Sequence, residues 1–166
     1  MKKITIIGKH NNDMLNKTEK KALRQNINYD EPPHEEQVKL INKCYMNIED
    51  EMLVFIKREI EKKRNGYKSQ DNKKNIICDL ITYDELIEKL VISRLLCDYC
   101  KKKVKILFKE VRDKQQWTLD RIDNDLGHTN INTKICCLKC NLERRCLDSK
   151  KFEFTKQLKI TKAGIL

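Results

Sequence analysis

The chain has 166 residues, of which 37% are charged and 39% hydrophobic, and its formal net charge is +11. This length suits a single domain, or a small domain with an appended helical region, and the composition excludes a large hydrophobic core. No run of residues approaches the roughly 18 apolar residues that a membrane span needs, so a membrane is not an expected partner.

Residues 1–31 show little apolar periodicity. Ile4, Ile6 and Ile7 favour a short strand, whereas the polar residues that follow predict a poorly ordered segment. The apolar run at the start is too short for a secretion signal. We therefore expect an intracellular, reducing compartment, which is the cytoplasm, or the nucleus of a host cell if the chain is viral.

Residues 32–96 are predicted to be helical. Apolar residues recur at three- and four-residue steps from Val38 to Ile60, which predicts one amphipathic helix over 34–64. Its apolar face is a candidate surface for a homodimer or for a partner protein. Gly66 and the polar residues around it predict the end of this helix and a linker over 65–75.

A second helix is predicted to begin after Thr82. Thr82 and Glu85 have the spacing of a capping box, in which each side chain satisfies a free backbone N–H of the first turn. Ile81 and Leu86 are placed to pack against each other across this turn. The apolar positions Leu86 and Leu90 then predict a stripe that packs against the first helix and leads into the cysteines.

Two Cys-x-x-Cys pairs stand out among the eight cysteines. Cys97 and Cys100 form the first pair, and Cys137 and Cys140 repeat the spacing after 36 intervening residues. Two such pairs can supply the four thiolates of a tetrahedral structural zinc site. Cys136 is expected to lie on a strand without reaching the metal. The remaining cysteines lack partners at ligand spacing and are expected to be ordinary thiols: Cys44, Cys78 and Cys146.

Residues 97–166 are predicted to form an α+β domain stapled by this zinc. The pattern predicts strands over 104–110, 116–121 and 132–136, with a loop over 124–130. A helix over 138–148 and a last helix from Ser149 complete the prediction.

The basic excess is concentrated in the same segment. Residues 97–166 contain 17 Lys and Arg against 9 Asp and Glu, whereas residues 1–96 contain 19 against 16. A polyanion is the natural partner of such a segment, DNA before RNA, although a merely soluble basic surface is the alternative. The candidate nucleic-acid-binding residues are Lys101, Lys102, Lys103, Arg121, Lys139, Arg144 and Arg145.

The stretch 117–145, WTLDRIDNDLGHTNINTKICCLKCNLERR, resembles the HNH endonuclease family, in particular its four-cysteine zinc branch. The resemblance covers about the last third to half of the chain. Its DRIDN and GHT motifs are similar to those of proteins encoded by large DNA viruses and phages. The resemblance implies a ββα-metal unit, in which a hairpin is followed by a helix.

The resemblance also implies a set of site residues. Asp120 and Asn141 match the ligands of a catalytic Mg²⁺ or Mn²⁺, and Asn132 matches an asparagine that ties the loop together by backbone hydrogen bonds. Arg121 departs from the family, because it stands where the histidine general base usually lies. A guanidinium has a pKa above ~12 and cannot take a proton from water, but it can bind a phosphate.

His128 is the candidate replacement base. The alternative is a histidine that stabilises the loop or contacts a phosphate. Asp123 is either an additional metal ligand or an acidic loop cap, and the cap is slightly preferred. Gly127 suits the turn that the loop needs.

Two classes of function therefore compete. The leading hypothesis is a metal-dependent HNH-type endonuclease that hydrolyses phosphodiester bonds of DNA. The alternative is a non-catalytic, zinc-stapled nucleic-acid-binding module, in which Arg121 has converted the site into a phosphate grip. A protein-interaction role for the helix over 34–64 is compatible with both.

Overall fold

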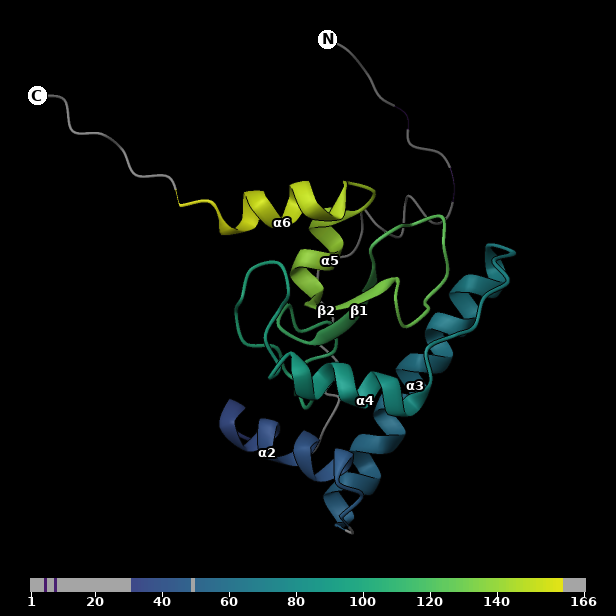
Figure 1. Ribbon diagram of the computed structural model, residues 1–166. Coiled ribbons are helices and arrows are strands. Elements are labelled where there is room, and N and C mark those ends of the chain that lie inside the picture. The colour runs from purple at the N-terminus through teal and green to yellow at the C-terminus, as the bar shows by residue number, and fades with distance from the viewer. Residues whose placement is uncertain (1–4, 6–7, 9–30, 49, 160–166) are drawn as a thin grey trace, which may run out of the picture.

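The computed structural model describes residues 5, 8, 31–48 and 50–159, so the segment 1–31, predicted to be a strand or poorly ordered, lies almost wholly outside it. The described part is α+β, as predicted, with helices around one two-stranded antiparallel sheet (Figure 1). Its elements in chain order are α2 (His34–Tyr45), α3 (Glu51–Lys73), α4 (Tyr83–Ile92), β1 (Trp117–Arg121), β2 (Thr133–Cys137), α5 (Leu138–Arg144) and α6 (Ser149–Gln157). The hairpin lies between the helices that precede it and the two that follow it. No helix of the described residues has the length and apolar character to cross a membrane.

The predicted helix over 34–64 is two helices. The chain turns after Tyr45, where Asn47 takes a left-handed conformation with φ 54°. Asp50 then caps α3 by accepting a hydrogen bond from the Met52 backbone N–H at 2.9 Å. The apolar periodicity runs through this turn without a break, so periodicity alone could not reveal it. Most of the predicted dimer face is used within the chain, since Ile41 and Ile56 lie fully buried in its own core.

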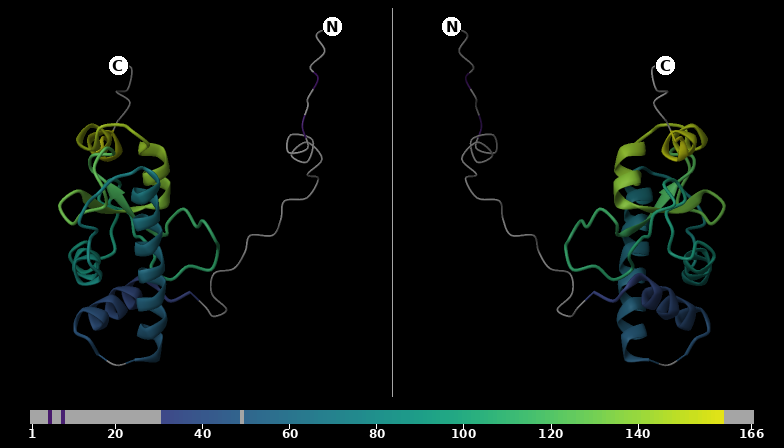
Figure 2. Two further views of the ribbon diagram at one scale, coloured as in Figure 1. Left: turned by 90° about the vertical axis from the view of Figure 1, so that its right-hand side faces the viewer. Right: turned by 90° about the vertical axis from the view of Figure 1, so that its left-hand side faces the viewer.

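The predicted linker over 65–75 is also wrong, because α3 continues through Gly66 to Lys73. Figure 2 shows this helix standing upright through the height of the molecule. Tyr67 and Asp71, one turn apart, are buried, and the Tyr67 hydroxyl accepts a hydrogen bond from the Leu119 N–H of β1 at 2.9 Å. A glycine inside a helix costs about 1 kcal/mol relative to alanine. Burial of the helix against the hairpin outweighs that cost.

The helix predicted after Thr82 is present as α4. Its capping box is complete: the Thr82 N–H donates to Glu85 Oε2 at 2.8 Å, and the Glu85 N–H donates to Thr82 Oγ1 at 3.3 Å. Ile81 and Leu86, on either side of the cap, are both buried. These local signals sufficed to place the helix.

The predicted strand over 104–110 is absent. Its backbone is instead satisfied by Gln37 of α2, whose Oε1 accepts from the N–H groups of Ile106 at 2.8 Å and Leu107 at 3.0 Å. Lys105 makes only an isolated parallel bridge with Gln116. The Gln37 side chain takes the place of a neighbouring strand as hydrogen-bond acceptor, and no local sequence pattern indicates such a long-range contact.

The hairpin forms close to where it was predicted. Trp117 pairs with Cys137 and Arg121 pairs with Thr133 in an antiparallel ladder. Side chains alternate across a strand, so Thr118 and Asp120 face α5 whereas Trp117 and its alternating neighbours face α3. The outer edge of β1 is bordered by α3 rather than by another strand, which protects it from pairing with another chain.

The helix predicted over 138–148 ends earlier, at Arg144, because Arg145 takes a positive φ of 52°. Asp148 then caps α6 by accepting from the Lys151 N–H at 2.9 Å. The last helix therefore begins at Ser149, as predicted.

Candidate functional site

The four cysteines of the two pairs converge as predicted. The sulfur atoms of Cys97, Cys100, Cys137 and Cys140 all lie within 4.8 Å of one another, and the Cys100 and Cys137 sulfurs are 4.0 Å apart. Four sulfurs about 2.3 Å from one ion in a tetrahedron lie roughly 3.8 Å from one another. The cluster therefore has the donor set and the spacing for a metal ion such as zinc.

Local turns deliver these sulfurs. The Lys101 N–H donates to the Cys97 carbonyl at 2.9 Å, with Lys101 in a left-handed conformation. Cys137 caps α5, and its sulfur accepts the Cys140 N–H at 3.4 Å. Burial raises the pKa of Cys140 to about 12, so a cation is needed to hold these thiols as thiolates. Cys136 lies on β2 outside the cluster, as expected.

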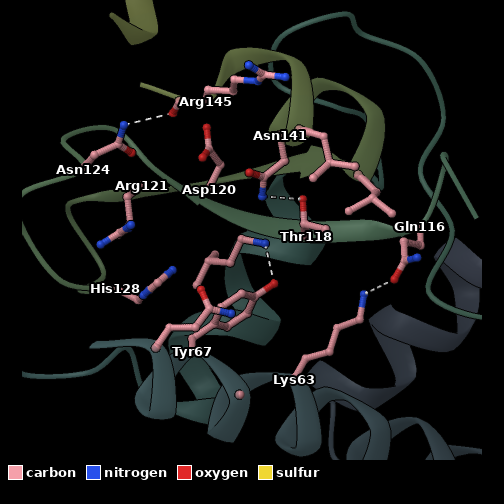
Figure 3. A pocket seen from close by; sticks show the side chains of 15 residues that line it. Lys63, Tyr67, Gln116, Thr118, Asp120, Arg121, Asn124, His128, Asn141 and Arg145 are labelled. Carbon is pink, nitrogen blue, oxygen red and sulfur yellow. Dashed lines mark hydrogen bonds between the residues drawn. The ribbon is translucent and has the colours of Figure 1, made fainter. Parts of the chain in front are cut away.

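A pocket of about 480 Å³ opens at the outer edge of β1, between α3 and α5, and we call it the edge pocket. Figure 3 looks into it: Asp120, Asn141 and Arg145 lie on the α5 side of the strand, and Lys63, Tyr67 and His128 lie on the α3 side. Its lining includes Lys63, Gly66, Tyr67, Gln70, Thr118, Asp120, Arg121, Asn124, His128, Asn141, Leu142 and Arg145. The structure thus gathers four of the five predicted catalytic residues, Asp120, Arg121, His128 and Asn141, at one pocket, but on two different walls.

His128 is held on the α3 wall by Asp71. Its ring Nδ1 lies 2.7 Å from Asp71 Oδ1, and its backbone N–H donates to Asp71 Oδ2 at 2.9 Å. The ring stacks on Tyr67 with 4.7 Å between centroids. These contacts fasten the loop before β2 to α3, so His128 does stabilise the loop.

The same contacts fix the protonation of the pair. Burial lowers the pKa of His128 below its ordinary value of 6.5, although Asp71 opposes this. Burial alone would raise the pKa of Asp71, but the hydrogen bonds from His128 outweigh it and lower that pKa. An ionised carboxylate can only accept, so the ring proton of a neutral His128 lies on Nδ1 and the lone pair on Nε2.

Nε2 of His128 remains open to the edge pocket. Among the described residues, the only fully buried side-chain nitrogen or oxygen without a hydrogen-bond partner is the Tyr83 hydroxyl. Nε2 makes no hydrogen bond with the described residues and is not among these fully buried atoms, so it retains slight exposure at the pocket although the His128 side chain is only 4% exposed. A neutral imidazole with its lone pair facing a pocket is the arrangement that a general base requires.

On the other wall, Asp120 is engaged by protein donors. Its Oδ2 accepts from Arg144 Nε at 2.6 Å and from the Tyr99 hydroxyl at 2.6 Å. Its Oδ1 accepts from Arg144 Nη2 at 3.2 Å. The predicted cation ligand is thus already paired with a cation.

The prediction that Arg144 binds nucleic acid is wrong, because its side chain is buried. Its side chain is 1% exposed, and all three guanidinium nitrogens donate to acceptors inside the protein. Burial would lower the pKa of Arg144, but the bond with Asp120 outweighs this and raises it. Arg144 and Arg145 were both predicted to bind nucleic acid, whereas α5 ends between them and only Arg145 is exposed.

Asn132 makes the loop-tying bonds that the resemblance implied. Its Oδ1 accepts from the Asp123 N–H at 2.9 Å, and its Nδ2 donates to the carbonyls of Asp123 at 2.9 Å and Gly127 at 3.0 Å. Asp123 caps the loop, as preferred, by accepting from the Asp125 N–H at 2.9 Å. These hydrogen bonds therefore fix the loop between β1 and β2 at Asp123 and Gly127.

Gly127 is needed for a reason other than the one predicted. Its φ is not positive, but a Cβ there would lie 2.2 Å from the Cys78 sulfur. The glycine lets the loop pass close to the segment after α3, which brings His128 to Asp71. Close backbone approach, not turn geometry, therefore explains this residue.

Asn141 lines the edge pocket from α5, and its Nδ2 donates to Thr118 Oγ1 at 3.1 Å. The side-chain oxygen is the atom that a cation would use, and the bond to Thr118 leaves it without a described partner. Asn141 and Asp120 thus lie on the same wall, as the resemblance implied, but only Asn141 has an uncommitted oxygen.

The predicted basic residues separate into two groups. Lys101 pairs with Asp98 at 3.2 Å, Lys103 pairs with Glu35 at 2.7 Å, and neither lines the edge pocket. Lys102 and Lys139 are also outside it, with Lys139 lying 3.9 Å from Glu143. Of the predicted set, only Arg121 and Arg145 line the pocket; Arg145 is exposed, whereas the Arg121 side chain is 12% exposed and lies 3.9 Å from Asp71.

Lys63 is a third cation at this pocket, and sequence reasoning missed it. Its Nζ donates to Gln116 Oε1 at 3.1 Å and lies 4.6 Å from the centre of the Trp117 ring. Burial lowers the pKa of Lys63 to about 7. Asp71 was missed as well, because it lies in the part of α3 that was predicted to be a linker over 65–75, whereas Lys63 lies within the predicted helix and had no signal that it faces the hairpin. The 67-to-71 spacing of two inward-facing residues was the only available signal.

No family model, no curated protein and no solved structure matches the chain. The site is therefore described by its own geometry.

Proposed function

We propose that the chain is a nucleic-acid phosphodiesterase of the HNH endonuclease type, with DNA as its substrate. In this proposal β1, β2 and α5 form the ββα unit, and the edge pocket binds the phosphate to be hydrolysed. The four-cysteine cluster holds a structural zinc that fixes the start of α5 against the loop at Cys97.

The observation that carries the proposal is the pair of His128 and Asp71. Asp71 orients the ring and keeps the proton on Nδ1, so Nε2 can take a proton from an attacking water. Arg121 and Arg145 border the same pocket and can offset the negative charge of a phosphate. A module that only binds nucleic acid needs the two arginines but has no need of a neutral, oriented imidazole.

Asp120 leaves little room for a catalytic divalent ion as the side chains lie. Oδ2 accepts from both Arg144 and Tyr99, and Oδ1 accepts from Arg144, so only one lone pair, on Oδ1 beside the guanidinium, is left for Mg²⁺. No step is therefore assigned to an ion at this position. Asn141 remains able to orient a phosphate or water through its side-chain oxygen.

The bond between Asp120 and Arg144 favours a second candidate, the non-catalytic nucleic-acid-binding module. There, the guanidinium of Arg144 takes the place of the cation, and the aspartate is retained because it stabilises the fold. His128 then serves only to hold the loop.

Incubation of the purified chain with supercoiled plasmid and with branched DNA, with and without Mg²⁺ or Mn²⁺, separates the two. We expect cutting, and we expect His128→Ala to slow it by about 100-fold or more, the usual contribution of a general base. The rate should rise with pH and level off above the pKa of His128, which lies below 6.5.

His34→Ala is the matched control, because His34 lies on α2, where its ring bonds the Leu95 carbonyl, and it does not line the edge pocket. It should cut like the unchanged protein. Tight binding without any cutting, in every metal condition, would replace the nuclease by the binding module. Asp120→Ala is not a clean test of catalysis, because it leaves Arg144 buried without its partner.

A further inference from the structure

The face of α3 that borders the edge pocket contains a glycine, Gly66, that the fold does not require. Gly66 lies in the interior of a 23-residue helix, where alanine is more stable by about 1 kcal/mol. A Cβ at this position would meet nothing within 4 Å. Neither backbone conformation nor packing in the chain therefore requires glycine here, which contrasts with Gly127.

Lys63, Gly66 and Gln70 are spaced by three and four residues, so they lie on one face of α3, and all three line the pocket. This face is a shallow groove wall with a cation at one end and an amide at the other. On the opposite wall stands Arg145, an exposed cation at the end of α5.

The charge of the groove is positive. Its arginines are Arg121, which lies 3.9 Å from Asp71, and Arg145, and the only acid in its lining, Asp120, is neutralised by Arg144. Lys63 donates to Gln116 and to the Trp117 carbonyl, and burial lowers its pKa to about 7. A bound phosphate favours the protonated ammonium, whose third N–H is then available to it. The pocket volume of about 480 Å³ is in the range of small-ligand sites, which extends from about 300 to 1,000 Å³.

We propose that a single sugar–phosphate backbone lies in this groove directly against α3 at Gly66, with its phosphates between Lys63 and Arg145. The missing side chain at Gly66 then lets the strand approach the helix, in the way that glycines admit phosphates elsewhere. This inference rests on the proposed function for its ligand class but not on cleavage. It assigns nucleic-acid contact to a helix outside the segment with the basic excess.

The test is Gly66→Leu, with Gly66→Ala as a milder variant. Both should raise the melting temperature, because alanine and leucine are better helix formers than glycine and a Cβ at this position meets nothing within 4 Å. Both should nevertheless weaken binding of a short fluorescent oligonucleotide, because an added side chain keeps the sugar–phosphate backbone away from the helix. We expect a loss of about 10-fold or more for leucine, which is roughly 1.4 kcal/mol, and a smaller loss for alanine. Fluorescence anisotropy with non-cleavable single-stranded DNA, duplex DNA and RNA measures binding and shows which form enters.

Ser69→Ala is the matched control, because Ser69 is exposed on the same helix but does not line the pocket. It should leave binding of all three probes unchanged. If Gly66→Leu is folded and binds every probe like the unchanged protein, the inference is overturned while the proposed nuclease can stand. If the unchanged protein binds but never cuts, and Gly66→Leu weakens binding, the nuclease fails and the groove stands.

Discussion

The two walls of the edge pocket each contain a buried aspartate, and the partners of these aspartates differ. On the α5 wall, Asp120 is paired with Arg144, whose charge is permanent. On the α3 wall, Asp71 is paired at 2.7 Å with His128, whose ring is neutral, and its contact with the Arg121 guanidinium is longer, at 3.9 Å. A carboxylate that meets an arginine forms a fixed structural link, whereas one that meets a histidine can prepare a proton acceptor.

This difference changes where chemistry is expected. The family resemblance directs attention to Asp120 and Asn141 on the α5 wall. The geometry places the group best suited to accept a proton, His128, on the α3 wall instead, where its partner Asp71 lies outside the stretch that resembles the family. The α5 wall then serves mainly to position Arg145 and Asn141 opposite it.

The largest expected effect comes from the cysteine cluster, which supports the α5 wall alone. Cys137→Ser should lose the metal and unfold α5, because structural zinc contributes on the order of 10 kcal/mol in small domains. Metal content and thermal melting measure this. Cys146→Ser, an exposed cysteine outside the cluster, is the control and should change neither. An unchanged zinc content in Cys137→Ser would remove the cluster from the metal assignment.

The next effect compares the two aspartates directly. Arg144→Ala leaves Asp120 charged and buried, so the free energy of unfolding should fall by about 3–5 kcal/mol. Asp71→Asn disturbs a pair whose histidine is neutral and should cost less, about 1–3 kcal/mol. Urea unfolding of both variants measures the difference, with Asp79→Asn, an exposed aspartate, as the control. Equal losses at Arg144 and Asp71 would show that the two pairs are electrostatically alike.

The smallest effect is the pH dependence of stability from His128. Its pKa in the folded protein is below the ordinary 6.5, so the unfolded chain takes up a proton first as pH falls through 6.5. Stability should therefore decline with acidification in the window just below 6.5, by no more than about 1.4 kcal/mol per pH unit. Asp71 and Asp120 raise this pKa, Arg121 lowers it, and burial dominates.

Unfolding of the unchanged protein and of His128→Gln at about pH 7.5 and about pH 5.5 isolates this contribution. Loss of zinc at acidic pH affects both proteins alike and cancels in the difference. The slope should be shallower in His128→Gln. A steeper slope in the variant would mean that His128 is charged in the folded protein.

The sequence by itself determined the local features of this protein. Cysteine spacing predicted which four thiols meet, and the capping box of Thr82 and Glu85 located α4. Alternation predicted the hairpin, and the α+β class followed. Each of these features depends on residues that are close in the chain or on a donor set with few geometries.

Only the tertiary structure decided the site. Asp71 and His128 are 57 residues apart, and their contact requires α3 to continue past Gly66 and the loop to pass closely at Gly127. Local propensity opposes the first condition, and packing against the edge of β1 overrides it. The pairing of Arg144 with Asp120 likewise depends on where α5 ends. Burial across such separations sets which charges meet, and local pattern does not contain that information.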